Sequence, residues 1–218
     1  MFNVFIDPGA TAKAVRAPLV WLWPLIITSI VSIAYGMFFT PLMMDTMRKY
    51  PPNGVSGEQL DRMLHFTEMF ARIGTFVTPL ILAGFIALFA ALVMLTASMM
   101  SIRIKFRDVF ALMSMCSLIN VLQIIASYFV LRAKADEIGS MQQLQPPFGL
   151  DIFFSDLKGP LFAILNYFSL FQVWYLVILT LAFAYLTGSS KGKAFAAITP
   201  AWLIPLLFKI VGSLFQRS

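Results

Sequence analysis

Five long apolar runs separated by short polar stretches dominate the pattern of this chain. They cover residues 19–39, 74–100, 109–131, 160–187 and 195–214. A transmembrane α-helix needs about 20 apolar residues to cross the hydrocarbon core of a bilayer, and each run meets that length. We therefore predict an all-α polytopic membrane protein, a bundle of five transmembrane helices that forms a single domain over residues 1–218.

Two further helices are predicted beside these runs. Asp7 and Pro8 are typical of a helix start, and we expect a short N-terminal helix lying at the membrane interface, with a docking element for a partner as the alternative. Ser56 and Gln59 match a capping box, after which apolar residues recur at helical spacing from Leu60 to Phe70. This pattern predicts an amphipathic outer helix that leads directly into the second span.

The composition agrees with a membrane protein. The chain is 60% apolar and only 12% charged, against about 25% charged residues in soluble domains. Its mean hydropathy is +0.84.

Basic residues predict the orientation, because Lys and Arg that flank spans stay on the cytoplasmic side. They are concentrated in the N-terminal segment and in the second and fourth connections, whereas the first and third connections balance bases with acids. The two basic connections contain Arg103, Lys105, Arg107, Lys191 and Lys193. We expect a cytoplasmic N-terminus and an external C-terminus. The net charge of +6 then indicates attraction to anionic lipid headgroups and not a nucleic-acid surface.

Small residues recur four apart on two spans. They are Thr28, Ser32 and Gly36 on the first span and Ala83, Ala87 and Ala91 on the second. This spacing allows close backbone approach, so we expect both stripes to face other helices, including those of a partner.

Uncharged polar side chains lie within the third and fourth runs. They are Ser117, Asn120 and Gln123 in the third and Asn166, Ser169 and Gln172 in the fourth. At about 1.5 Å per residue, Asn120, Gln123 and Gln172 fall near the membrane midplane. Lipid tails offer an amide no hydrogen-bond partner, so these side chains either form hydrogen bonds across helices or line a polar cleft for a ligand.

Catalytic and metal-binding constellations are missing from the sequence. His65 is the single histidine and Cys116 the single cysteine, which excludes a multi-histidine metal set and an internal disulfide. We predict no catalytic residue, no metal and no cofactor. An intramembrane hydrolase with His65 as its base is the least favoured alternative.

The stretch over residues 171–195 resembles the core signature of the Yip-one domain family, named for Ypt-interacting proteins. Residues 4–8 and 21–24 resemble the start of its prokaryotic members, and the chain is similar to the bacterial type because its first span begins near Leu19. The resemblance implies a five-span fold with the N-terminus inside and the C-terminus outside, and no enzymatic activity. It also implies a possible association with ABC-type exporters of the macrolide and antimicrobial-peptide efflux class, beside which some bacterial relatives occur.

Two functions follow as hypotheses. The first is a non-enzymatic accessory or scaffold subunit in a bacterial inner membrane, which binds another integral membrane protein or a further copy of itself. The alternative is a small permease or lipid-handling channel with an uncharged polar cleft lined by Asn120, Gln123, Asn166 and Gln172.

Overall fold

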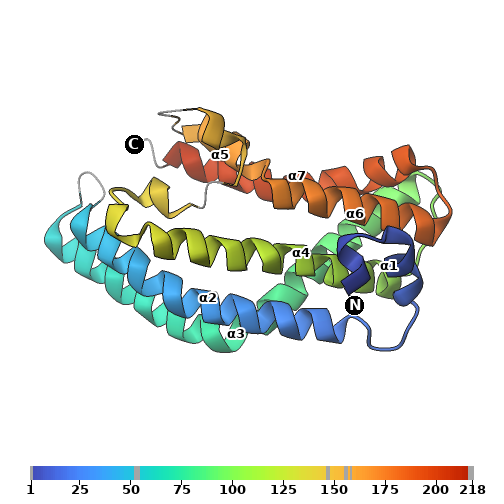
Figure 1. Cartoon of the computed structure of the whole chain (residues 1–218), viewed down its shortest axis with the longest axis horizontal. Coiled ribbons are helices and arrows are strands. Elements are labelled where there is room, and N and C mark those ends of the chain that lie inside the picture. The colour runs from blue at the N-terminus through green and yellow to red at the C-terminus, as the bar shows by residue number, and fades with distance from the viewer. Residues whose placement is uncertain (1, 52–54, 146–147, 155–156, 158, 216–218) are drawn as a thin grey trace.

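The computed structural model describes residues 2–51, 55–145, 148–154, 157 and 159–215, and all regular structure within them is helical (Figure 1). The α-helices are α1 (Pro8–Ala14), α2 (Leu22–Lys49), α3 (Gly57–Met99), α4 (Phe106–Ala133), α5 (Gly159–Tyr167), α6 (Leu170–Thr187) and α7 (Lys191–Phe215). Short 3-10 turns are η1 (Phe2–Phe5), η2 (Ala135–Glu137), η3 (Met141–Leu144) and η4 (Leu150–Phe153). In this part of the chain five helices are long and apolar enough to cross a membrane, which confirms the predicted fold class.

The centre of the bundle is α4. Of its most apolar stretch 61% is buried, compared with 17% for α2 and 22% for α3. Leu112 and Ile119 are fully buried there. In Figure 1, α2 lies along one side of α4 and α6 along the other, and α7 packs on α6. A helix that is apolar all round fits this central position, because it has no polar face that needs water.

The long helix α3 joins the predicted outer helix and second span without a break. Its capping box is formed, since the Ser56 hydroxyl accepts the Gln59 N–H at 3.3 Å and the Ser56 N–H donates to the Gln59 side-chain oxygen at 2.9 Å. The first part of α3 runs beside α2, and the second part passes α4 to pack against α7 (Figure 1). Pro79 lies within this helix, and a proline there removes a backbone hydrogen bond and favours a bend.

The fourth apolar run is two helices and not one. Helix α5 ends at Tyr167 and α6 begins at Leu170, which corrects the continuous span predicted over 160–187. Ser169 is extended and caps α6 by accepting the Gln172 N–H at 3.2 Å, and the Leu170 N–H donates to the Phe148 carbonyl at 3.1 Å. A break at membrane depth is tolerated where such groups satisfy the freed backbone.

The N-terminal segment forms the predicted short helix and packs on the bundle. The Asp7 carboxylate accepts the Ala10 N–H at 2.8 Å, as expected of an N-cap. Val4 and Val15 are fully buried, and the Trp174 indole N–H donates to the Phe5 carbonyl at 3.1 Å. One side of α1 is therefore covered by α6, so this segment is part of the core.

Candidate functional site

The three midplane amides meet between α4 and α6. The Gln172 side-chain nitrogen donates to the side-chain oxygens of Asn120 and Gln123, both at 3.4 Å. Asn120 lies at the middle of α4, and Gln172 is in the first turn of α6 just after the helix break. The break therefore places a side chain from the fourth run at the depth of the two α4 amides.

Ser117 and Thr28 join α4 to α2. Their hydroxyl oxygens lie 3.1 Å apart, within hydrogen-bond distance. Each also lies 2.7 Å from a backbone carbonyl oxygen of its own helix, that of Ser114 for Ser117 and that of Pro24 for Thr28. Because a hydroxyl has one proton, one of the two donates to its carbonyl while the other donates across the helix pair. Thr28 is buried. Thr28 therefore contacts α4 of this chain, which corrects its expected place on a partner-facing stripe, while Ser32 and Gly36 further along α2 are half-buried.

Asn166 and Ser169 are buried near the break but have different neighbours. Ser169 caps α6, whereas Asn166 lies between two charged groups: its side-chain oxygen accepts from the Lys209 ammonium at 3.1 Å, and its side-chain nitrogen donates to the Asp151 carboxylate at 3.4 Å. An amide that accepts from a cation and donates to an anion links the two charges. This connection between η4, α5 and α7 was not predicted, because the three residues are far apart in sequence.

The small-residue pattern on α3 differs from the predicted one. Ala83 and Ala87 are half-buried, and Ala91 is exposed. The exposed face instead has small and large residues in alternation at steps of three and four: Ile81, Gly84, Leu88, Ala91, Leu95 and Ser98. We call these six residues the heptad face. This is the spacing of a left-handed helix pair, in which small residues permit close approach. The signal is visible in the sequence only when a step of seven is searched.

The two basic connections lie at one end of the bundle, which we call the basic end (Figure 1). There the Thr96 hydroxyl of α3 donates to the Ala197 carbonyl of α7, near both connections. Arg107 donates to the Ala17 carbonyl at 3.2 Å, so the segment after α1 is at the same end. The basic side chains are exposed: Arg103, Lys105, Arg107, Lys191 and Lys193. They can act together on an anionic surface.

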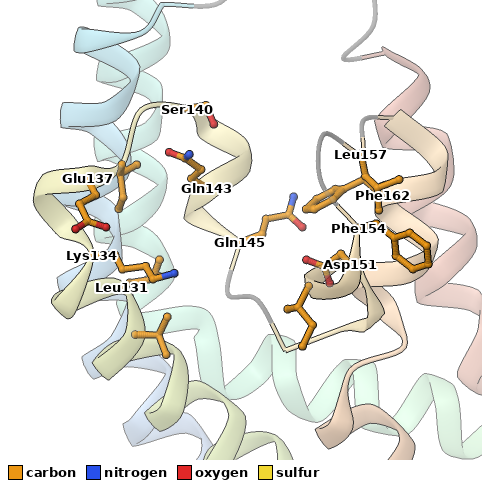
Figure 2. Close-up of a pocket in the computed structure, with 13 residues that line it drawn as sticks. Leu131, Lys134, Glu137, Ser140, Gln143, Gln145, Asp151, Phe154, Leu157 and Phe162 are labelled. Carbon is orange, nitrogen blue, oxygen red and sulfur yellow. The ribbon is translucent and has the colours of Figure 1, made fainter.

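A cavity of about 470 Å³ opens at the opposite end of the bundle. Figure 2 shows Lys134 and Glu137 on one wall, Asp151 and Phe162 on the other, and Gln145 between them. It combines acids, a base and amides with aromatic side chains. The segment between α4 and α5 forms most of its wall, and none of the sequence patterns above predicted a cavity there.

A second cavity, of about 230 Å³, lies inside the bundle. We call it the midplane cavity. It is bordered by α3, α4, α6 and α7 and by Tyr167 of α5, and Asn120, Gln172 and Ser117 are in its wall. The amides are therefore bonded to one another and also face a space.

The residues considered for catalysis are apart from one another. His65 is exposed on the outer part of α3, whereas Cys116 is fully buried in α4. Among the described residues no group of three or more His, Cys, Asp or Glu side chains is placed to hold a metal ion.

Comparison with known proteins identifies the family. A sequence model described as the Yip1 domain matches residues 2–212, nearly the whole chain. No curated protein and no solved structure matches it. The Yip1 family is generally non-enzymatic. This five-span helical membrane protein therefore belongs to the Yip1 domain family.

Proposed function

We propose that this protein is a non-enzymatic accessory or scaffold subunit that binds another integral membrane protein through the heptad face of α3. The observation that carries the proposal is the regular alternation of small and large residues on this exposed face: Gly84, Ala91 and Ser98 lie between Ile81, Leu88 and Leu95, which are 51%, 53% and 60% exposed. Lipid tails are as apolar as leucine, so exposure alone does not favour a protein partner. A regular series of small residues does, because it allows a second helix to pack closely.

The favoured partner is an ABC-type exporter in a bacterial inner membrane. The support for this choice is the resemblance of residues 4–8 and 21–24 to prokaryotic members, together with the exposed basic end. There Arg103, Lys105 and Lys191 would contact acidic surfaces of the partner or anionic lipids on the cytoplasmic side. A further copy of this chain is the alternative partner.

Partner binding is tested by co-purification after gentle extraction from the protein's own host. The triple variant Gly84→Leu, Ala91→Leu and Ser98→Leu should recover about tenfold less partner, the ratio expected when a membrane helix contact of about 1–2 kcal/mol is lost. A side chain added at Gly84 meets no atom of this chain within 4 Å, so the fold should be kept.

Gly212→Leu is the matched control, because an added side chain there also meets no atom within 4 Å. It should recover as much partner as the unaltered protein. Equal recovery with the triple variant would refute the role of the heptad face, and the absence of any co-purified membrane protein would refute the scaffold proposal.

The proposed orientation places the basic end in the cytoplasm, and it has a separate test. In a Cys116→Ala background, a membrane-impermeant maleimide should label Glu137→Cys in intact cells and Lys191→Cys only after permeabilisation. Both replaced side chains are exposed, at opposite ends of the bundle. The reverse labelling pattern would refute the orientation.

A second candidate function is a small permease or lipid-handling channel, favoured by the amides that face the midplane cavity. Reconstituted protein should then move a solute or scramble lipids faster than protein-free liposomes do. Rates equal to those of the protein-free liposomes would exclude it.

A further inference from the structure

The midplane cavity lies where only membrane components have access. Asn120 is in its wall and stands at the centre of α4, which runs from Phe106 to Ala133, or about 20 Å from either helix end at about 1.5 Å per residue. Phe85 also lines the cavity and is 53% exposed on α3, so the cavity opens there onto the surface that faces lipid.

One wall of the cavity has hydrogen-bonding groups that the described part of the protein does not satisfy. The Gln172 amide nitrogen donates to Asn120 and Gln123, which leaves the Gln172 side-chain oxygen and the Asn120 amide nitrogen without a partner among the described residues. The Tyr175 hydroxyl in the same wall is also without a partner among the described residues. In hydrocarbon such groups are costly unless something else bonds to them.

A second observation comes from α7, which forms another part of the wall. Trp202 is 9% exposed, and its indole nitrogen is buried without a hydrogen-bond partner in the described structure. This nitrogen is enclosed by the protein, and it adds an unsatisfied donor on α7 to the open groups of α4 and α6 around one cavity. None of the residues that line it, all within the described part, is Asp, Glu, Lys or Arg. The cavity thus offers hydrogen bonds but no countercharge.

The size of the cavity limits what it can hold. About 230 Å³ exceeds the roughly 150 Å³ of an engineered apolar cavity that binds benzene, and is below the approximately 300–1,000 Å³ typical of drug-sized ligands. One chain fits this space, whereas a phospholipid with two chains and a charged headgroup does not.

We propose that the midplane cavity binds an uncharged single-chain lipid whose hydroxyl or carbonyl group bonds to Asn120, Gln172 and Tyr175. The chain of the lipid lies against the apolar walls and leaves toward the bilayer past Phe85. The polar groups of this site lie inside the bundle and not on the heptad face, and the test below uses the purified chain without a partner, so it can fail separately from the proposed function.

The test uses the purified full chain in phosphatidylcholine nanodiscs and two photoreactive probes. One probe is a long-chain primary alcohol with a diazirine in its chain, and the other is the same chain without the hydroxyl. After irradiation, crosslinked peptides are mapped by mass spectrometry. The alcohol should label cavity-lining segments of α6 and α7 about fivefold more than the hydrocarbon probe, the ratio expected for one net hydrogen bond.

Variants distinguish labelling by a probe bound in the midplane cavity from labelling by a probe dissolved in the surrounding bilayer. Gln172→Leu should abolish the preference for the alcohol, and Ala201→Leu, which fills the cavity wall, should reduce labelling by both probes. Ala196→Leu is the matched control on the exposed side of the same helix and should leave labelling unchanged.

Equal labelling by the two probes in the unaltered protein would overturn the proposal, and it is the result expected if the cavity holds water only. Labelling that Ala201→Leu leaves unchanged would overturn it too. If Ala201→Leu does not fold, as judged by gel filtration and circular dichroism, the ratio of the two probes in Gln172→Leu decides the question.

Discussion

Gly149 is predicted to be intolerant of any side chain, because two segments meet closely there. A methyl group at this position would lie 2.5 Å from the Leu165 carbonyl oxygen, 2.6 Å from the Asn166 Cα and 2.5 Å from the Asp151 carboxylate. Carbon atoms in contact normally lie about 3.5–4.0 Å apart. Two of the three atoms are backbone, which cannot rotate away, so the loop or α5 would have to move.

The expected cost of Gly149→Ala is about 2–3 kcal/mol, the upper part of the range for overpacked cores. The free energy of unfolding is measured by titration with SDS in mixed micelles, followed by far-UV circular dichroism. Gly84→Ala is the matched control, since an added methyl group meets nothing within 4 Å there. Alanine is also the better helix former by up to about 1 kcal/mol, so the control should be neutral or slightly stabilising.

An unfolding free energy of Gly149→Ala within about 0.5 kcal/mol of the unaltered protein, the usual range for surface substitutions, would refute this reasoning. It would mean that the loop of residues 148–154 does not pack on α5 as closely as the structure shows. The Leu170 N–H, which donates to the Phe148 carbonyl of this loop, would then need another acceptor.

Three further experiments test single contacts. Thr28→Val and Ser117→Ala should show a coupling of about 0.6–1 kcal/mol in a double-mutant cycle by the same titration, because their hydroxyls lie 3.1 Å apart, whereas additive effects would disprove the contact. Gln172→Leu should lower the unfolding free energy by about 1–2 kcal/mol, since two amide oxygens lose their donor, and an unchanged value would argue against the cluster. Trp174→Phe should speed amide hydrogen exchange in residues 4–15 about fivefold by removing the bond to Phe5; unaltered exchange would show that this bond does not hold the segment.

The parts of the fold predicted from sequence depend on local signals. The cap at Asp7 and the capping box of Ser56 and Gln59 were visible because each involves residues within four positions of one another. The five apolar helices followed from run length alone, since the bilayer sets a minimum length whatever the neighbours are.

The features missed depend on contacts between distant segments. The break between α5 and α6 is stabilised by the Phe148 carbonyl, 22 positions before the Leu170 N–H that it accepts. The sequences on both sides of the break are apolar, so the hydropathy profile shows one continuous run. The contact between Lys209 and Asn166 joins residues 43 positions apart, and no pattern within either helix indicates it. Among the predicted polar residues, Asn120, Gln123 and Gln172 do meet, although Gln172 lies in the first turn of α6 and not in the middle of one continuous span.

The central position of α4 explains why α3 is the helix proposed to bind a partner. The faces of α4 are taken up mainly by α2, α3 and α6, so it has little surface left for a second protein. The exposed surfaces of α2 and α7 carry bulky side chains such as Met37 and Phe208, at 69% and 74% exposure. Such surfaces suit fluid lipid, which adapts to their shape. On α3, Gly84 and Ala91 are exposed small residues between large ones, and such positions allow the close approach of a rigid partner helix. The decisive experiment is therefore steric: leucine at the small positions should lower partner recovery about tenfold, although it makes the surface no less apolar.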